Sequence, residues 1–199
     1  PILSVASVAL LGLSVDWTAA ALLAFTIFFY AVVYSMWLKR RTPQNIVIGG
    51  AAGAFPPMIG WVAATHSIDL GAVVLFLIIF LWTPPHFWAL ALLKSEEYAK
   101  NGIPMMPVVK GVRRTKIEMV VYSVLVAAIG VVPSMIGIAS IAYGVAAGLL
   151  GAAFVAFSLI VLRTEDPVWP RRMYGFSILY LMLLFAFLLV EGGAQSVVA

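Results

Sequence analysis

Residues 39–45 bring phosphate-binding side chains together in one short segment, which reads Lys-Arg-Arg-Thr-Pro-Gln-Asn. Thr42 is a favoured residue at a helix N-cap and Pro43 suits the first helical position, so we expect a helix to begin here. The free N–H groups and positive dipole end of such a helix, flanked by cations and amides, suit a phosphate group. Anchoring at a membrane surface is an alternative reason for the cations, but it does not account for the amides. The candidate diphosphate-binding residues are Lys39, Arg40, Arg41, Gln44 and Asn45.

A second polar segment, residues 94–104, interleaves acids and bases. Glu96 and Glu97 are adjacent carboxylates, and proteins hold Mg²⁺ with one or two carboxylates together with substrate phosphates. These two glutamates are therefore the candidate metal ligands, and with Lys94 they are the candidate catalytic residues. Plain solvation at a membrane surface is the alternative interpretation. Additional phosphate contacts are expected from Lys110 and Arg113, and from Arg114 and Lys116, whereas Glu118 suits the N-terminal dipole of a following helix.

His86 lies inside an apolar segment, beside the proline pair at 84–85. An ionisable residue within a membrane span is a functional hypothesis by default. If the helix continues to Glu97, 11 residues further on, the two side chains share one face about 16 Å apart. The alternative is a histidine satisfied within a protein core. The candidate residues for an apolar substrate pocket are His86, Trp82, Phe87 and Trp88.

The elements that position these residues must be membrane helices. The chain has 199 residues, of which 64% are hydrophobic and 10% charged, and its mean hydropathy is +1.10. A soluble domain has about 25% charged residues. The absence of cysteine excludes disulfides, thiolate metal sites and cysteine nucleophiles. Seven apolar stretches predict an all-α bundle that crosses the membrane at residues 1–15, 17–38, 44–64, 69–93, 117–138, 140–162 and 173–191.

The basic residues predict the orientation of this bundle. All 12 lie in three connections, within residues 39–41, 94–116 and 163–172, and none lies in the alternate connections or the C-terminal tail. Basic loops stay on the cytoplasmic or matrix side, so we place residue 1 inside, residue 199 outside and the candidate site on the inner face. The same pattern explains the net charge of +4 without nucleic-acid binding.

Three strings of the sequence together resemble a known family. They are residues 37–57, residues 82–88, and the segment Tyr-Ala-Lys-Asn-Gly-Ile-Pro-Met-Met-Pro-Val-Val at 98–109. In this order and spacing they resemble the protoheme IX farnesyltransferases, a branch of the intramembrane UbiA prenyltransferase superfamily. The resemblance is strong over about residues 30–125, and beyond these it extends to hydrophobic spans of suitable number and length.

The resemblance implies nine transmembrane helices and two acidic motifs that hold Mg²⁺ and an isoprenoid diphosphate on the cytoplasmic face. The seven spans would then be the third to ninth helices, in a single domain over residues 1–199. The second acidic motif would fall at Glu96 and Glu97, where relatives more often carry aspartate. The first motif, of the type Asn-Asp-x-x-Asp-x-x-x-Asp, does not occur here. With Pro1 in place of an initiator Met, this predicts an N-terminally truncated chain that is inactive alone.

The activity implied is transfer of a farnesyl group from farnesyl diphosphate to a vinyl group of haem B, giving haem O. Haem B is then a substrate, and His86 is expected to orient it or touch its iron. The implied location is a bacterial inner membrane rather than a mitochondrial one, with a haem A synthase or a terminal oxidase as partner. A polyprenyltransferase of quinone synthesis shares the fold, but residues 39–45 and 83–88 favour the haem branch. A secondary transporter also uses proline-broken helices, yet does not require acids and bases in one inner loop.

Overall fold

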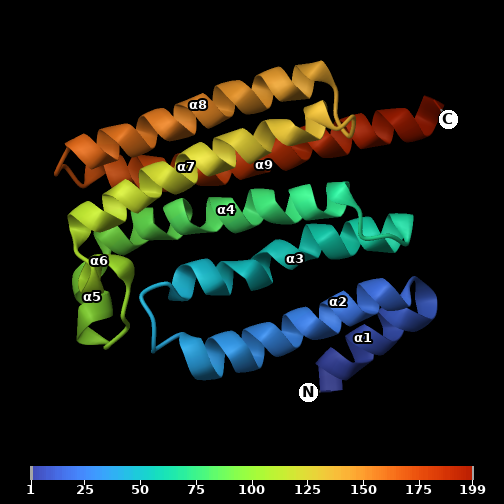
Figure 1. The fold of residues 1–199 in the computed structure, drawn as a ribbon, viewed down its shortest axis with the longest axis horizontal. Helices are drawn as coiled ribbons and strands as arrows, with labels where there is room; N and C mark the ends of the chain where they lie inside the picture. The colour runs from blue at the N-terminus through green and yellow to red at the C-terminus, as the bar shows by residue number, and fades with distance from the viewer. Residues whose placement is uncertain (1, 199) are drawn as a thin grey trace.

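The computed structural model describes the backbone of residues 2–198 and the side chains of residues 2–192. Throughout this part of the chain the structure is helical, and the long helices run side by side (Figure 1). The elements are α1 (Ile2–Ser14), α2 (Trp17–Phe28), the π-helical segment η1 (Phe29–Leu38), α3 (Asn45–Thr65), α4 (Leu70–Leu93), α5 (Ser95–Lys100), α6 (Met106–Val109), α7 (Val112–Met135), α8 (Ile141–Arg163) and α9 (Val168–Val198).

Six of these segments are long and apolar enough to cross a membrane: α2 with η1, α3, α4, α7, α8 and α9 up to Gly192. The prediction of an all-α membrane bundle is confirmed, and six of the seven predicted spans reach this length. The first predicted span corresponds to the shorter apolar helix α1, of 13 residues. Helices α7 and α9 also begin five residues before the predicted spans, because backbone hydrogen bonding continues beyond the apolar residues.

Helix α4 lies at the centre of the bundle and contacts α3, α7 and α9. On one side of it α3, α2 and α1 follow in order, and on the other side α7, α8 and α9 pack together (Figure 1). The larger buried cluster lies on this second side, where Trp88, Tyr143, Phe154 and Tyr180 are fully buried. The two tyrosine hydroxyls donate to helix carbonyls, Tyr143 to Gly130 at 3.0 Å and Tyr180 to Val126 at 3.2 Å.

The connections that carry the basic residues gather at one end of the bundle. In Figure 1 this is the left end, where the α2–α3 connection, α5, α6 and the α8–α9 connection lie. The connections without basic residues gather at the opposite end, which we call the outer end. There Asp16 caps α2 by accepting from the backbone N–H of Ala19 at 2.8 Å, and Asp69 caps α4 by accepting from Gly71 at 2.8 Å. The helix order therefore places all three basic segments on one face, as the charge pattern predicted.

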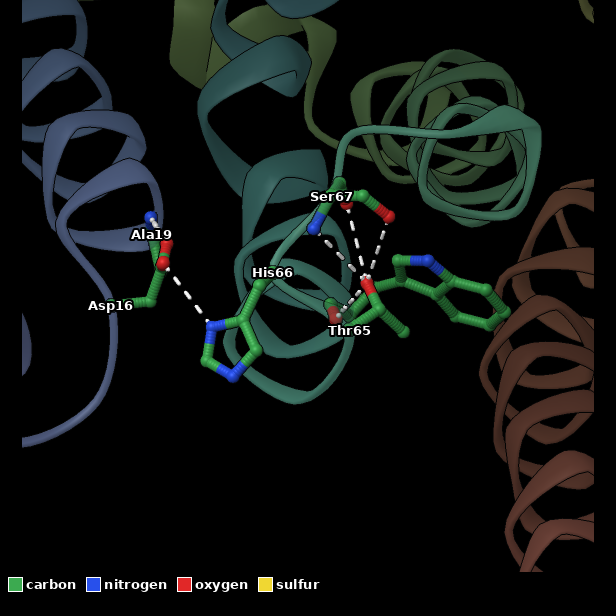
Figure 2. Close-up of polar contacts among 6 residues, drawn as sticks. Asp16, Ala19, Thr65, His66 and Ser67 are labelled. Carbon is green, nitrogen blue, oxygen red and sulfur yellow. Dashed lines mark hydrogen bonds and ion pairs between the residues drawn. The ribbon is translucent and has the colours of Figure 1, made fainter.

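A side-chain contact joins two neighbouring connections at the outer end (Figure 2). Nδ1 of His66 lies 3.2 Å from the second carboxylate oxygen of Asp16. His66 ends α3 in the left-handed conformation, with φ of 57°. This conformation turns the chain away from the helix, and the contact ties the end of α3 to the turn between α1 and α2.

Candidate active site at the basic face

The α2–α3 connection forms a tight turn before helix α3. The backbone N–H of Asn45 donates to the carbonyl of Thr42 at 3.2 Å, and Gln44 has φ of −83° and ψ of 12°. These are the features of a type I β-turn, which favours proline at its second position, here Pro43. The predicted N-cap is therefore wrong: Gln44, and not Thr42, precedes the first helical residue. The Thr42 hydroxyl instead accepts from the Gln44 N–H at 3.2 Å inside the turn.

Asn45 holds this connection closed from the inside. Its side chain is only 1% exposed, and Nδ2 donates to the carbonyl of Lys39 at 3.1 Å. Its Oδ1 is buried and has no hydrogen-bond partner within the described structure. The predicted diphosphate-binding residues therefore separate into two groups. Asn45 points inward and positions the backbone, whereas the exposed Lys39, Arg40 and Arg41 form no ion pair with any described residue.

The span that leads into this connection ends in the π-helical segment η1. Its widened hydrogen bonding runs up to Lys39, whose N–H donates to the carbonyl of Tyr34 at 2.8 Å. Long π-helical stretches are rare and are frequently found at functional sites. The rings of Tyr30 and Tyr34 lie 5.5 Å apart on this segment. No proline or glycine marks residues 29–38, so the sequence carries no signal for this distortion.

The acidic segment forms the short helix α5 and lines a polar cleft of about 460 Å³ with the end of α4. Lys94 ends α4, with φ of −120°, and its ammonium lies 3.2 Å from the carboxylate of Glu97. Because the helix breaks at Lys94, the premise of one continuous helix from His86 to Glu97 is wrong. Glu96 and Glu97 both remain exposed in the cleft. No third histidine or acidic side chain joins them to complete a metal-binding cluster among the described residues.

The basic residues that follow divide between exposed and structural positions. Lys110 and Arg113 are exposed and form no ion pair within the described chain. Arg114 pairs with Glu118 at 2.5 Å one turn along α7, so Glu118 lies in the second turn rather than serving as a cap. Lys116 is 5% exposed and donates to the carbonyl of Thr164 at 2.6 Å. Lys116 thus fastens α7 to the α8–α9 connection and is not available to a phosphate.

An apolar cavity of about 390 Å³ opens between η1, α3 and α4. Space for it comes from small residues: a Cβ on Gly50 would lie 2.7 Å from Thr83, whereas one on Gly53 would meet nothing within 4 Å. Of the predicted pocket residues, the cavity brings together Trp82 and Phe87. Its lining comprises Tyr30, Tyr34, Ile46, Gly49, Gly50, Gly53, Ile79, Trp82, Thr83 and Phe87.

The other two predicted pocket residues point elsewhere. Trp88 is fully buried in the core, where its ring meets Tyr122 of α7 edge-on at 5.5 Å. His86 is 7% exposed and turns toward α9, with Nδ1 2.7 Å from the hydroxyl of Ser177. Its ring stacks on Trp82 at 4.2 Å. Sequence reasoning missed Ser177 and the tyrosines of the cavity, since contacts across 91 residues leave no mark in the local sequence.

Comparison with known proteins fits this arrangement of a polar face above an aromatic cavity. The sequence profile of the UbiA prenyltransferase family matches residues 2–191. The chain belongs to the UbiA prenyltransferase family. UbiA prenyltransferases generally use Mg²⁺. No solved structure was found to match the chain.

Three curated relatives of this UbiA chain carry the name protoheme IX farnesyltransferase. The relative from Rhizobium rhizogenes is 58% identical over 96% of this chain and 61% of its own length. The relative from Agrobacterium fabrum is 56% identical over 99% of this chain and 63% of its own length. The relative from Parvibaculum lavamentivorans is 56% identical over 96% of this chain and 61% of its own length. The chain therefore spans about three fifths of the length of these relatives.

Proposed function

We propose that the complete protein is a protoheme IX farnesyltransferase, which transfers the farnesyl group of farnesyl diphosphate to haem B and forms haem O. Its curated relatives, such as the 58% identical protein of Rhizobium rhizogenes, support this assignment. The structural observation that carries it is that one end of the bundle holds an aromatic cavity, two exposed carboxylates and the cations 39–41, which form no ion pair with the described residues. A charged diphosphate and an apolar prenyl chain need these two environments side by side.

The exposed carboxylates suit a magnesium ion shared with the substrate. Glu96 and Glu97 would hold it, because Mg²⁺ accepts one or two carboxylates and completes its shell with phosphate oxygens and water. When bound, the ion supplies positive charge that neutralises the diphosphate. The ion pair with Lys94 keeps Glu97 at the mouth of the cleft. Glu96 and Glu97 are the two acidic side chains that line this cleft, and the described residues bring no third histidine or acidic side chain to join them.

The cations of the α2–α3 connection promote the first step of the reaction. In this step the allylic C–O bond breaks and the diphosphate leaves with the electron pair. Lys39, Arg40 and Arg41, together with Lys110 and Arg113, bind the leaving group, and their charges stabilise the negative charge that develops on it. The exposed positions of all five allow them to reach a phosphate at the membrane surface.

The aromatic cavity serves the second step, in which a carbon–carbon bond forms. Aromatic faces such as those of Tyr30, Trp82 and Phe87 stabilise the positive charge of the allylic carbon. The electron pair of a haem vinyl group attacks this carbon, and the charge moves to the carbon beside the porphyrin. Water adds there and releases a proton, which gives the hydroxyethylfarnesyl side chain of haem O.

The protein is an integral membrane protein with bacterial relatives. We place it in a bacterial inner membrane with the basic face in the cytoplasm, where farnesyl diphosphate is soluble. Haem O formed there passes to enzymes that oxidise haem O or use it directly, such as a haem A synthase or a terminal oxidase.

The test uses the complete gene product in membranes with farnesyl diphosphate, haem B and Mg²⁺. We expect a haem whose mass has increased by one farnesyl group and one hydroxyl group. Glu97→Gln and Arg41→Gln should greatly reduce this product. Arg171→Gln removes an exposed charge from the first turn of α9 on the same face and should leave it unchanged. Absence of this product would overturn the proposal, as would prenylation of an aromatic acid, added in a parallel assay, in place of haem B.

A further inference from the structure

His86 is held on both faces and on one edge by side chains of two helices. Trp82 stacks on one face at 4.2 Å with an interplanar angle of 20°, and Tyr174 of α9 stacks on the ring at 4.7 Å and 24°. Nδ1 lies 2.7 Å from the hydroxyl of Ser177. Ser177 also accepts, through its backbone carbonyl, a hydrogen bond of 2.8 Å from the indole of Trp82. The imidazole therefore has one fixed orientation between α4 and α9.

The hydrogen bonds of Ser177 determine which ring nitrogen carries the proton. The Ser177 hydroxyl lies 2.6 Å from the carbonyl of Tyr174, and a carbonyl can only accept. The single hydroxyl hydrogen is therefore donated to Tyr174, so the Ser177 oxygen must accept from His86. Nδ1 of His86 consequently bears the hydrogen, and in the neutral ring Nε2 carries a free lone pair.

This lone pair has no partner within the described structure. Nε2 forms no hydrogen bond to the described residues, and it is not among the polar atoms that are fully enclosed without one. Trp82, on which the ring stacks, borders both the cavity between η1, α3 and α4 and an apolar groove of about 350 Å³ between α4 and α9. Nε2 is thus a fixed acceptor in apolar, aromatic surroundings.

Such an acceptor suits a metal that arrives with most of its ligands already in place. A free metal ion needs several protein ligands, and the described residues bring no group of three histidine or acidic side chains together anywhere. An iron atom held by four porphyrin nitrogens needs only one further ligand from the protein. Metal-bound histidines almost always donate their second N–H to a fixed acceptor, as His86 does to Ser177.

We propose that Nε2 of His86 binds the iron of the haem substrate and that Ser177 is a positioning residue that fixes the tautomer and orientation of His86. This inference rests on the proposed function, since it takes haem B as the substrate. Such a bond would hold the haem beside α4 and α9, and the surrounding side chains would have to set the rotation of the porphyrin that presents a vinyl group to the prenyl chain.

The experiment measures haem binding by the complete gene product through its absorption spectrum, separately from farnesylation. Wild type should bind haem B with the Soret band of a nitrogen-ligated iron. His86→Ala should lose this band and regain it when imidazole is added, which a merely misfolded protein would not do. Ser177→Ala should keep the nitrogen-ligated spectrum but bind haem about tenfold more weakly, because removing an outer hydrogen-bond partner costs about 10–100-fold in metal affinity.

The second histidine provides a matched control. His66 is exposed at the outer end, so His66→Ala should bind haem as wild type does. A His86→Ala spectrum identical to wild type would overturn the ligand assignment, and haem O formation by wild type would leave the proposed function standing. Unchanged affinity in Ser177→Ala would overturn the positioning role. Wild-type protein that neither binds nor farnesylates haem would overturn the proposed function and this inference together.

Discussion

Asn45 offers a direct test of how the basic connection is held in place. The side chain is 1% exposed and makes one hydrogen bond, to the carbonyl of Lys39. If this bond keeps residues 39–44 closed, weakening it raises the population of an open connection. Trypsin reports that population, because it cleaves after lysine and arginine and the connection holds three such residues in a row.

Two substitutions at this position should have different effects. Asn45→Ala removes one neutral hydrogen bond, worth about 1 kcal/mol, which raises the open population about fivefold. Asn45→Asp keeps the shape but places a carboxylate against a carbonyl. Protonating it at pH 7 costs about 4 kcal/mol, since each pH unit above the ordinary carboxyl pKa of 3.9 costs about 1.4 kcal/mol. A favourable interaction of the charged carboxylate with the α3 dipole offsets at most about 2 kcal/mol of this cost. The aspartate should therefore raise the population of the open connection about 30-fold or more.

The assay is limited tryptic cleavage of inverted membrane vesicles, with the fragment cut at residues 39–41 followed by mass. Cleavage follows the open population when reclosing is faster than cleavage. Gln44→Ala is the matched control, because Gln44 is exposed and its side chain makes no capping hydrogen bond. Equal cleavage of Asn45→Ala and Gln44→Ala, or slower cleavage of Asn45→Asp than of Asn45→Ala, would refute the reasoning.

Three further predictions concern stability. A hydrogen bond from a backbone N–H in the first turn of α2 lowers the pKa of Asp16. The charged carboxylate therefore contributes its full stabilisation above the ordinary carboxyl pKa of 3.8, and this stabilisation is lost as the pH falls below that value. The thermal unfolding midpoint should fall with acid in wild type and fall less in Asp16→Asn. Lys116→Met leaves the Thr164 carbonyl without its donor and should cost about 2 kcal/mol, measured by the unfolding midpoint in detergent. Gly50→Ala should destabilise by about 1–3 kcal/mol through its contact with α4, whereas Gly53→Ala, which meets nothing within 4 Å, should be nearly neutral by the same measurement.

The sequence could predict the helices and the basic face because both follow from local composition. The lengths of the apolar stretches predicted the ends of α3, α4 and α8 to within about two residues. The charge pattern predicted which connections lie at the same end of the bundle. The spans were less well predicted where helical hydrogen bonding and hydrophobicity stop at different residues. Helix α7 begins at Val112, before Arg113, Arg114 and Lys116, because charged residues end a hydrophobic stretch without ending a helix.

The orientation of side chains around α4 could not be predicted from the sequence. This helix is apolar on every side, so periodicity gives no preferred face, and adjacent residues point in different directions. Phe87 borders the cavity, Trp88 is buried against α7, and His86 faces α9. These directions are set by which helices pack against α4. The tertiary contact of His86 with Ser177 is therefore visible only in the folded structure.

The two ends of the bundle use charge in different ways, and this difference supports the proposed placement of the diphosphate. At the outer end the acids are engaged in the fold: Asp16 and Asp69 cap helices, and Glu191 accepts hydrogen bonds from Ser140. At the inner end the cations of residues 39–41 form no ion pair with the described residues. Like charges held close together in this way repel one another. A diphosphate bound there, as we propose, would relieve this repulsion, so the charges that disfavour the isolated connection would favour its complex.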